Sequence, residues 1–135
     1  MARKAKSKLA KLMSEKHVRA LYVPTPEEVK KWFRIINREV MGCRLRQFQD
    51  IEIRRRHGCW GECSGYTDED GTRYSDLSLN HHVRSRRHLV SIIAHEMTHA
   101  ITWQERGSMD HGDSFMYWKD KFRKFGVVLN IVQRT

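Results

Sequence analysis

The residues best suited to do chemistry lie in one stretch, SIIAHEMTHAITWQERGSMDHGDSF, at residues 91–115. Within it, His95 and His99 bracket Glu96, and His111 follows twelve residues after the second histidine. On an α-helix, residues four apart lie about 40° apart around the axis and about 6 Å along it, so two such imidazoles can reach one point. Glu96 falls on the flank of that point. Two imidazoles with a carboxylate beside them favour a metal ion that activates water.

A catalytic zinc ion needs a third protein ligand and one open position. His111 is the best candidate, because a chain that reverses at Gly107 brings it alongside the helix, and Gly112 leaves the backbone free to aim the ring. His88 shares the histidine face but lies about 10 Å along the axis from the nearer histidine, which is too far to share the ion. The other candidates for the third ligand are Glu105, Asp110 and Asp113.

The chemistry predicted for this stretch is metal-assisted hydrolysis of a peptide bond by a single Zn²⁺ ion. Zinc lowers the pKa of a bound water from ~15.7 towards ~7 and polarises the scissile carbonyl. Glu96 is predicted to be the general base, which takes the proton from the water and returns it to the leaving amine.

The length of 135 residues fits one domain, and we expect a monomer. No apolar run approaches the ~18 residues that a membrane span needs, and the basic N-terminus has no apolar segment behind it. We therefore expect no membrane association and a cytoplasmic location, in the host cytoplasm if the source is a virus. The three cysteines argue against a disulfide framework, and a structural zinc at Cys59 and Cys63 is disfavoured.

The net charge of +10 is unevenly distributed along the chain. Residues 1–56 hold 16 Lys and Arg against 6 Asp and Glu, whereas residues 57–135 hold 10 of each class. This asymmetry favours a polyanion as partner, and DNA, single- or double-stranded, is the leading candidate over a merely solubilising charge. The candidate nucleic-acid contacts are Arg3, Lys4, Lys6, Lys8, Lys11, Arg54, Arg55 and Arg56.

The elements that must position these residues follow from local signals. Helices are predicted over residues 26–41 and 86–105 and from 113 or 114 to about 125. Ile51 and Ile53 predict a strand, residues 58–66 and 72–79 a hairpin with an Asp-Gly turn, and residues 127–132 a final short strand. This order lacks regular β–α alternation, so the predicted class is α+β.

The N-terminal residues 1–20 are predicted to be a basic, flexible tail, followed by one domain at residues 21–135. Three apolar residues in this tail have the spacing of a short amphipathic helix, which we expect to order only on a partner. They are Leu9, Leu12 and Met13.

Four sequence elements together resemble the SprT-like metalloproteases, a family that includes the Spartan proteases. They are WGECS at residues 60–64, HEMTHA at 95–100, HGDSF at 111–115, and a glycine at 126 that leads into LNI at 129–131. The order and rough spacing agree over about residues 24–134. Many members also carry a C-terminal zinc ribbon with two cysteine pairs, which this sequence lacks, so it looks like a stand-alone domain of the kind found in bacteria and bacteriophages.

The resemblance implies that His95, His99 and His111 bind zinc and that Glu96 is the catalytic base. It also implies a minimal zincin-like, gluzincin-type fold, with three to four helices on a small antiparallel sheet, and a packed core position for Cys63.

Three functions remain open at this stage. The first is a zinc metalloprotease that acts on DNA-associated or DNA-crosslinked proteins, a substrate class that the resemblance implies. The second is a zinc-stabilised nucleic-acid-binding protein without proteolytic activity, and the third is a zinc hydrolase of a non-peptide substrate. Retention of Glu96 favours an enzyme, because a purely structural site has no use for a base beside a water.

Overall fold

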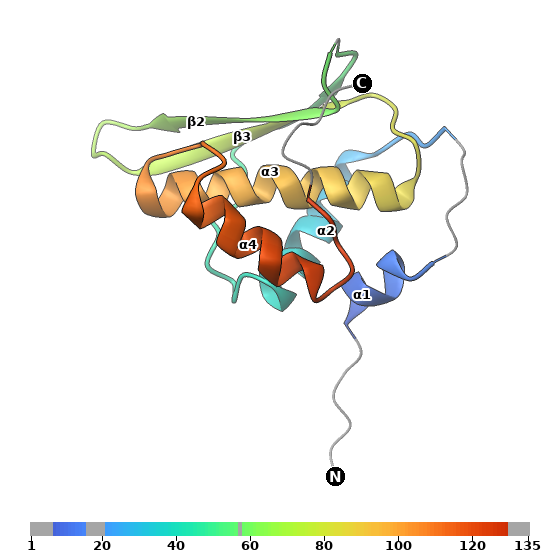
Figure 1. Cartoon of the computed structure of the whole chain (residues 1–135). Helices are drawn as coiled ribbons and strands as arrows, with labels where there is room; N and C mark the ends of the chain where they lie inside the picture. Colours follow the sequence, from blue (N-terminus) through green and yellow to red (C-terminus); the bar gives the residue numbers. More distant parts are fainter. Residues whose placement is uncertain (1–6, 16–20, 57, 130–135) are drawn as a thin grey trace.

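A computed structural model describes residues 7–15, 21–56 and 58–129 of the chain. These residues form an α+β fold in which α3 lies between a small sheet and α4 (Figure 1). In chain order the elements are α1 (Lys8–Met13), α2 (Pro26–Glu39), β1 (Ile51–Arg54), β2 (Gly61–Thr67), β3 (Arg73–Asn80), α3 (Arg86–Arg106) and α4 (Asp113–Arg123).

The two long helices begin and end at the signals that the sequence carries. The Thr25 hydroxyl accepts a hydrogen bond from the backbone N–H of Glu28 at 3.2 Å at the start of α2. At the start of α3, the Ser85 hydroxyl accepts a hydrogen bond from the backbone N–H of His88 at 3.0 Å. Gly107 ends α3 with φ of 71°, a left-handed conformation that glycine adopts without steric cost. Both helices are therefore fixed locally.

The sheet is mixed, with strand order β1-β3-β2. β2 and β3 form the expected antiparallel hairpin, but β1 pairs parallel to β3, with Ile51 opposite Leu77. The expectation of a wholly antiparallel sheet is therefore wrong for β1. Leu77 and Leu79 make β3 the most deeply buried strand, so β3 takes the centre and β1 and β2 pair along its two edges.

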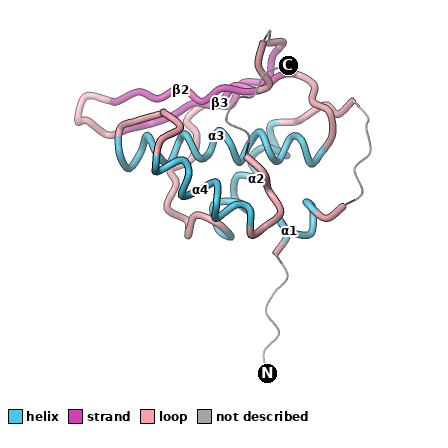
Figure 2. The backbone as a smooth tube through the Cα atoms, in the orientation of Figure 1, coloured by secondary structure: helices cyan, strands magenta, loops and turns pink. Residues whose placement is uncertain are grey.

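α3 is the centre of the hydrophobic core. It is covered by the sheet on one side and by α2 and α4 on the other (Figure 2). Its fully buried apolar side chains pack against those of the surrounding helices and of β3, so α3 is buried almost all round. The α3 members of this core are Leu89, Val90, Ile92, Ile93, Ala94, Met97, Ala100 and Ile101.

The segment at residues 8–13 is an ordered helix that packs on α2, which corrects the expectation of a flexible tail over this stretch. Leu9 and Leu12 are buried in the core. The carboxylate of Glu39, the last residue of α2, accepts hydrogen bonds from the Ser7 hydroxyl at 2.6 Å and from the Leu9 backbone N–H at 3.1 Å. The end of α2 thereby holds the start of α1 in place.

The predicted C-terminal strand is not formed in the residues that the structure describes. After α4 the chain turns at Gly126, which has φ of 82°, and Val127 and Leu129 bury their side chains in the core without strand pairing. Residues 130–132 of the predicted strand lie outside the described part. None of the described helices is long and apolar enough to cross a membrane.

Candidate metal centre

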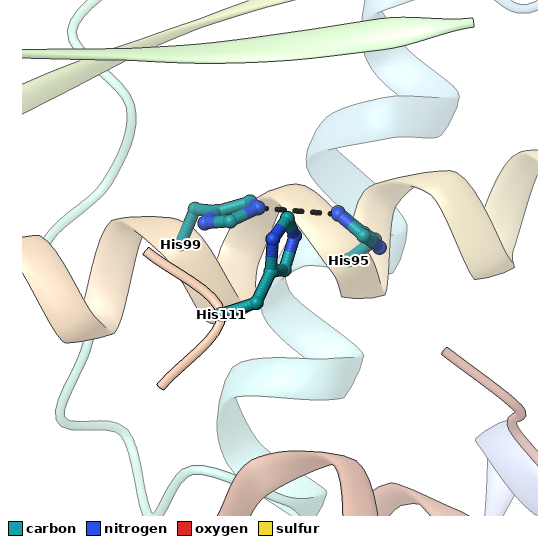
Figure 3. Close-up of side chains that lie close together, drawn as sticks. All are labelled: His95, His99 and His111. Atoms are coloured by element: carbon teal, nitrogen blue, oxygen red, sulfur yellow. Dashed lines mark hydrogen bonds between the residues drawn. The ribbon is translucent and has the colours of Figure 1, made fainter. Parts of the chain in front are cut away.

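Three imidazoles converge where α3 faces the loop that precedes α4. His95 and His99 project from α3, and His111 reaches them from the loop (Figure 3). One ring nitrogen of each histidine lies within 4.8 Å of those of the other two. The Nε2 atoms of His95 and His99 are 3.1 Å apart. The structure thus brings together the three histidines that the sequence predicted, and this group can hold a metal ion.

The dimensions of the group fit a metal ion bound by nitrogen. Ligand nitrogens about 2.0–2.1 Å from an ion at tetrahedral angles lie about 3.3 Å from one another. The separation of 3.1 Å between His95 and His99 is close to this value, and the ring nitrogens of the full set lie within 4.8 Å of one another. His95 is buried, His99 half-buried and His111 exposed, so the group opens to solvent at its third member.

The electrostatics of His99 favour the form that binds metals. Burial lowers the pKa of His99 to about 4, and the nearby His111 lowers it in the same direction. The backbone of Met109 and the carboxylate of Asp110 oppose this shift without overcoming it. His99 is therefore a neutral imidazole at neutral pH, and only the neutral ring has a lone pair to offer a metal.

Phe115 packs against the rings of all three histidines. Its ring centroid lies 5.2 Å from that of His95, 5.1 Å from that of His99 and 4.6 Å from that of His111. Phe115 was predicted only as a core residue of the last helix. Helical spacing does not connect the two residues, because His111 lies in the loop before α4; the sequence signal was only that both belong to the HGDSF element.

Glu96 is buried on the side of α3 that faces β2. Its carboxylate accepts a hydrogen bond from the backbone N–H of Cys63. Burial raises the pKa of Glu96 to about 8; the bond from Cys63 and the charge of Arg56 oppose this shift, and the charge of Glu62 adds to it. A carboxyl group in this environment can accept and release a proton near neutral pH.

β2 lies close against α3 because Gly61 has no side chain. A Cβ atom at this position would lie 2.8 Å from Cγ2 of Ile92 and 3.1 Å from Cδ2 of Leu79. The close approach lets the backbone of Cys63 reach Glu96. This contact was not predicted, because the sequence does not reveal which backbone group faces a helix. The Cys63 side chain packs against the core, as the resemblance implied, and burial raises the pKa of its thiol well above the usual range.

The other candidates for the third ligand stand outside the histidine group. Glu105 forms an ion pair with Arg44. The Asp110 carboxylate accepts a hydrogen bond from the backbone N–H of Gly112 at 3.1 Å, and Asp113 is exposed in the first turn of α4. Of the four candidates, the structure therefore favours His111.

His88 lies outside the histidine group, as its distance along the helix predicted, and contacts other residues. Its ring lies edge-on to Trp60, with centroids 4.8 Å apart, and its Nδ1 accepts a hydrogen bond from the backbone N–H of Arg84 at 3.1 Å. His88 thus secures the start of α3 against the segment that precedes β2.

The candidate nucleic-acid contacts that the structure describes lie in two separate places. Lys8 and Lys11 are exposed on α1, on the side of α2 away from the sheet (Figure 1). Arg54 and Arg55 are exposed at the end of β1, where Arg54 pairs with the Glu52 carboxylate.

Arg56 is committed to contacts within the protein. Its guanidinium donates to the Ser78 hydroxyl at 2.6 Å and pairs with Glu62, so little of it is free for a partner. The remaining three candidates, Arg3, Lys4 and Lys6, lie outside the described residues.

A comparison with known families gives a match over most of the chain. The SprT-like family matches residues 29–133, a range that includes β2, the helix that carries His95 and His99, and the His111 loop. No curated protein sequence gives a significant match to the chain. Because the family match covers most of the chain, this protein belongs to the SprT-like family.

Proposed function

We propose that this protein is a zinc-dependent metalloprotease. The observation that carries the proposal is the convergence of His95, His99 and His111, with the buried carboxylate of Glu96 one residue from His95 on the same helix. Membership of the SprT-like family, which is associated with metallopeptidase-like function, supports it. In this proposal the three histidines hold one Zn²⁺ ion, and the solvent-exposed side of His111 gives substrate its access.

In the proposed peptide hydrolysis, individual residues of the chain have separate roles. Zinc, when bound, supplies a Lewis acid that makes water acidic and polarises a carbonyl. The Glu96 carboxylate accepts a proton from the attacking water and donates it to the leaving amine nitrogen. The backbone N–H of Cys63 holds that carboxylate on the β2 side of α3, and Phe115 packs against all three histidine rings.

The donor set favours a catalytic over a purely structural zinc. A structural site closes all four positions with protein ligands, whereas a catalytic site keeps one open. Among the described residues, the metal-binding group contains three side chains. A buried carboxylate one residue from a metal ligand is suited to act as a general base, whereas a purely structural site has no role for it.

The proposed substrates are proteins bound or crosslinked to DNA. Support comes from the excess positive charge of residues 1–56 and from the exposed side chains of Lys8, Lys11, Arg54 and Arg55. Phosphate contacts of this kind bind nucleic acid without sequence preference and weaken steeply with salt.

The test is a cleavage assay with an unstructured protein substrate, run without DNA and with single- or double-stranded DNA. Glu96→Gln should abolish cleavage and leave zinc stoichiometry at the parent value, because the substitution removes a base but no ligand. Glu69→Gln, an exposed carboxylate in the β2–β3 turn, is the matched control and should cleave like the parent.

The outcomes separate the candidate functions. Cleavage by Glu96→Gln at the parent rate would refute the mechanism. DNA binding by both proteins with cleavage by neither would favour the alternative, a zinc-stabilised nucleic-acid-binding protein.

A further inference from the structure

The loop between α3 and α4 carries the one proposed ligand that no regular element positions. It runs from Gly107, which ends α3, to Gly112, which precedes α4. Its own hydrogen bonds are short-range: the Ser108 hydroxyl accepts from the Asp110 N–H at 3.3 Å, and Asp110 accepts from the Gly112 N–H. These bonds shape the loop, and the backbone of Met109 also forms a hydrogen bond with His99 on α3. A second contact places the loop relative to the sheet.

Met109, two residues before His111, makes that contact with β2. Gly65 on β2 has no side chain, and the space where its Cβ would stand is occupied from two sides. An added Cβ would lie 2.8 Å from the Cε methyl of Met109 and 2.7 Å from Cε2 of Trp103. The methionine methyl therefore rests on the bare backbone of the strand, beside the indole ring.

The Met109 methyl lies in a slot between Gly65 and the Trp103 ring. Two contacts hold the Trp103 side of this slot in place. The indole Nε1 of Trp103 donates a hydrogen bond to the backbone carbonyl of Tyr74 at 2.9 Å, and the Arg73 guanidinium lies over the ring, 5.8 Å from its centroid. Tyr74 and Arg73 belong to β3, the central strand. Trp103 is thus bound to the sheet as well as to its own helix, whereas Met109 reaches the slot with the end of a flexible side chain. Crowding in the slot is therefore expected to move Met109 more readily than Trp103.

We propose that Met109, seated between Gly65 and Trp103, is a positioning residue for His111. The slot joins the loop to β2 and to α3. β2 carries the backbone N–H that holds Glu96, and α3 carries the other two histidines. The Met109 side chain thus holds the loop against both β2 and α3. The inference rests on the proposed function in one respect, the assignment of His111 as a metal ligand.

The proposal is distinct from simple packing. If Met109 only fills space, its removal lowers the stability of the fold and leaves the affinity for metal unchanged in the folded protein. If it positions His111, the affinity falls in protein that is still folded. Substitutions of groups that orient metal ligands cost about 10–100-fold in affinity.

The experiment measures the Zn²⁺ dissociation constant of the full chain by competition with a chromophoric chelator. Met109→Ala is expected to weaken binding by about tenfold, the lower end of the range for orienting groups. Met109→Leu, which refills the slot, should return the affinity close to the parent value. Met116→Ala, a methionine that is 39% exposed on α4, is the matched control and should bind like the parent.

Gly65→Ala is a second variant, because its methyl group would meet the Trp103 ring at 2.7 Å and the Met109 methyl at 2.8 Å, and the flexible end of Met109 is the easier of the two to displace. This variant should weaken Zn²⁺ binding in the same direction. The visible absorption of bound Co²⁺ should change in both Met109→Ala and Gly65→Ala, because the third ligand is displaced. Thermal melting of each metal-free variant identifies the protein that remains folded.

The results distinguish two failures. If folded Met109→Ala and Gly65→Ala bind Zn²⁺ with parent affinity, the positioning role is refuted while the proposed function stands. If His111→Ala itself binds like the parent, the ligand assignment behind the proposed function is wrong, and the positioning role fails with it.

Discussion

Replacing Leu9 by alanine tests whether α1 belongs to the folded domain. The side chain of Leu9 is fully buried, and Leu12 and Met13 beside it are 2% and 8% exposed. The Glu39 carboxylate holds the start of this helix through hydrogen bonds to the backbone N–H groups of Lys8 and Leu9, each 3.1 Å long. Replacing this leucine by alanine therefore leaves a cavity in the core.

The expected cost follows from the burial and from the length of the helix. Truncating a buried leucine to alanine typically costs about 2–5 kcal/mol. α1 has only six residues and can shift to close part of the cavity, so we expect about 3 kcal/mol, in the lower half of that range. Unfolding entropy of about 2.1 cal/mol/K per residue, over 135 residues, converts this loss into a fall in melting temperature of about 10 °C.

The assay is urea and thermal denaturation at one fixed zinc concentration, since bound metal shifts the apparent stability. Lys11→Ala is the matched control, because it changes an exposed side chain on the same helix and should stay within about 0.5 kcal/mol of the parent. If Leu9→Ala also stays within about 0.5 kcal/mol of the parent, α1 does not pack on α2, and the reasoning from the burial of Leu9 is refuted.

The same reasoning changes how the role of the N-terminal charges must be tested. Deleting residues 1–20 would remove α1 together with Lys8 and Lys11, so weaker DNA binding could reflect a damaged fold. Deleting residues 1–6 removes Arg3, Lys4 and Lys6 and leaves the described helix intact. A loss of DNA binding from the shorter deletion can be assigned to charge.

Two further substitutions test how the elements are held together. Burial raises the pKa of Glu39, but the hydrogen bonds that this residue accepts from the start of α1 lower it more, so that it lies below its usual 4.5. Glu39→Gln should therefore lower stability most above pH 4.5, and its difference from the parent in denaturation curves should shrink as the pH falls through the lower, folded-state pKa. Glu69→Gln, an exposed carboxylate in the β2–β3 turn, is the control; a Glu39 effect that is constant from pH 3 to 7 would contradict the assignment. Gly61→Ala should cost about 1–3 kcal/mol of unfolding free energy, because the new methyl would meet the Ile92 side chain at 2.8 Å. Ser64→Ala on the exposed side of the same strand should be nearly neutral, and equal stability of the two variants would rule out the close approach of β2 to α3.

Elements with local signals were predictable from the sequence. The caps at Thr25 and Ser85 and the stop at Gly107 lie where the structure places them, because each signal acts on the few residues around it. The β2–β3 hairpin was predictable for the same reason, since an Asp-Gly turn joins neighbouring strands.

Elements decided by distant partners were predicted wrongly. The parallel pairing of β1 depends on which edge of β3 is free, and the sequence of β1 does not state this. Leu9 and Leu12 lie in a strongly basic stretch, and only the apolar surface of α2 and the Glu39 carboxylate make a helix there stable. Val127 and Leu129 have the alternation of a strand, yet the core covers them individually.

The candidate site shows the same division. The sequence by itself determined that His95 and His99 share one side of a helix with Glu96 on its flank, because the helical repeat fixes these positions whatever surrounds them. Only the tertiary structure decided that His111 joins them and that the backbone of Cys63 holds the carboxylate. Both contacts cross between elements, so they depend on how closely β2 and the loop pack against α3. Gly61 and Gly65 on β2 permit the close packing against Ile92 of α3 and Met109 of the loop, and no local pattern in the sequence connects these residues.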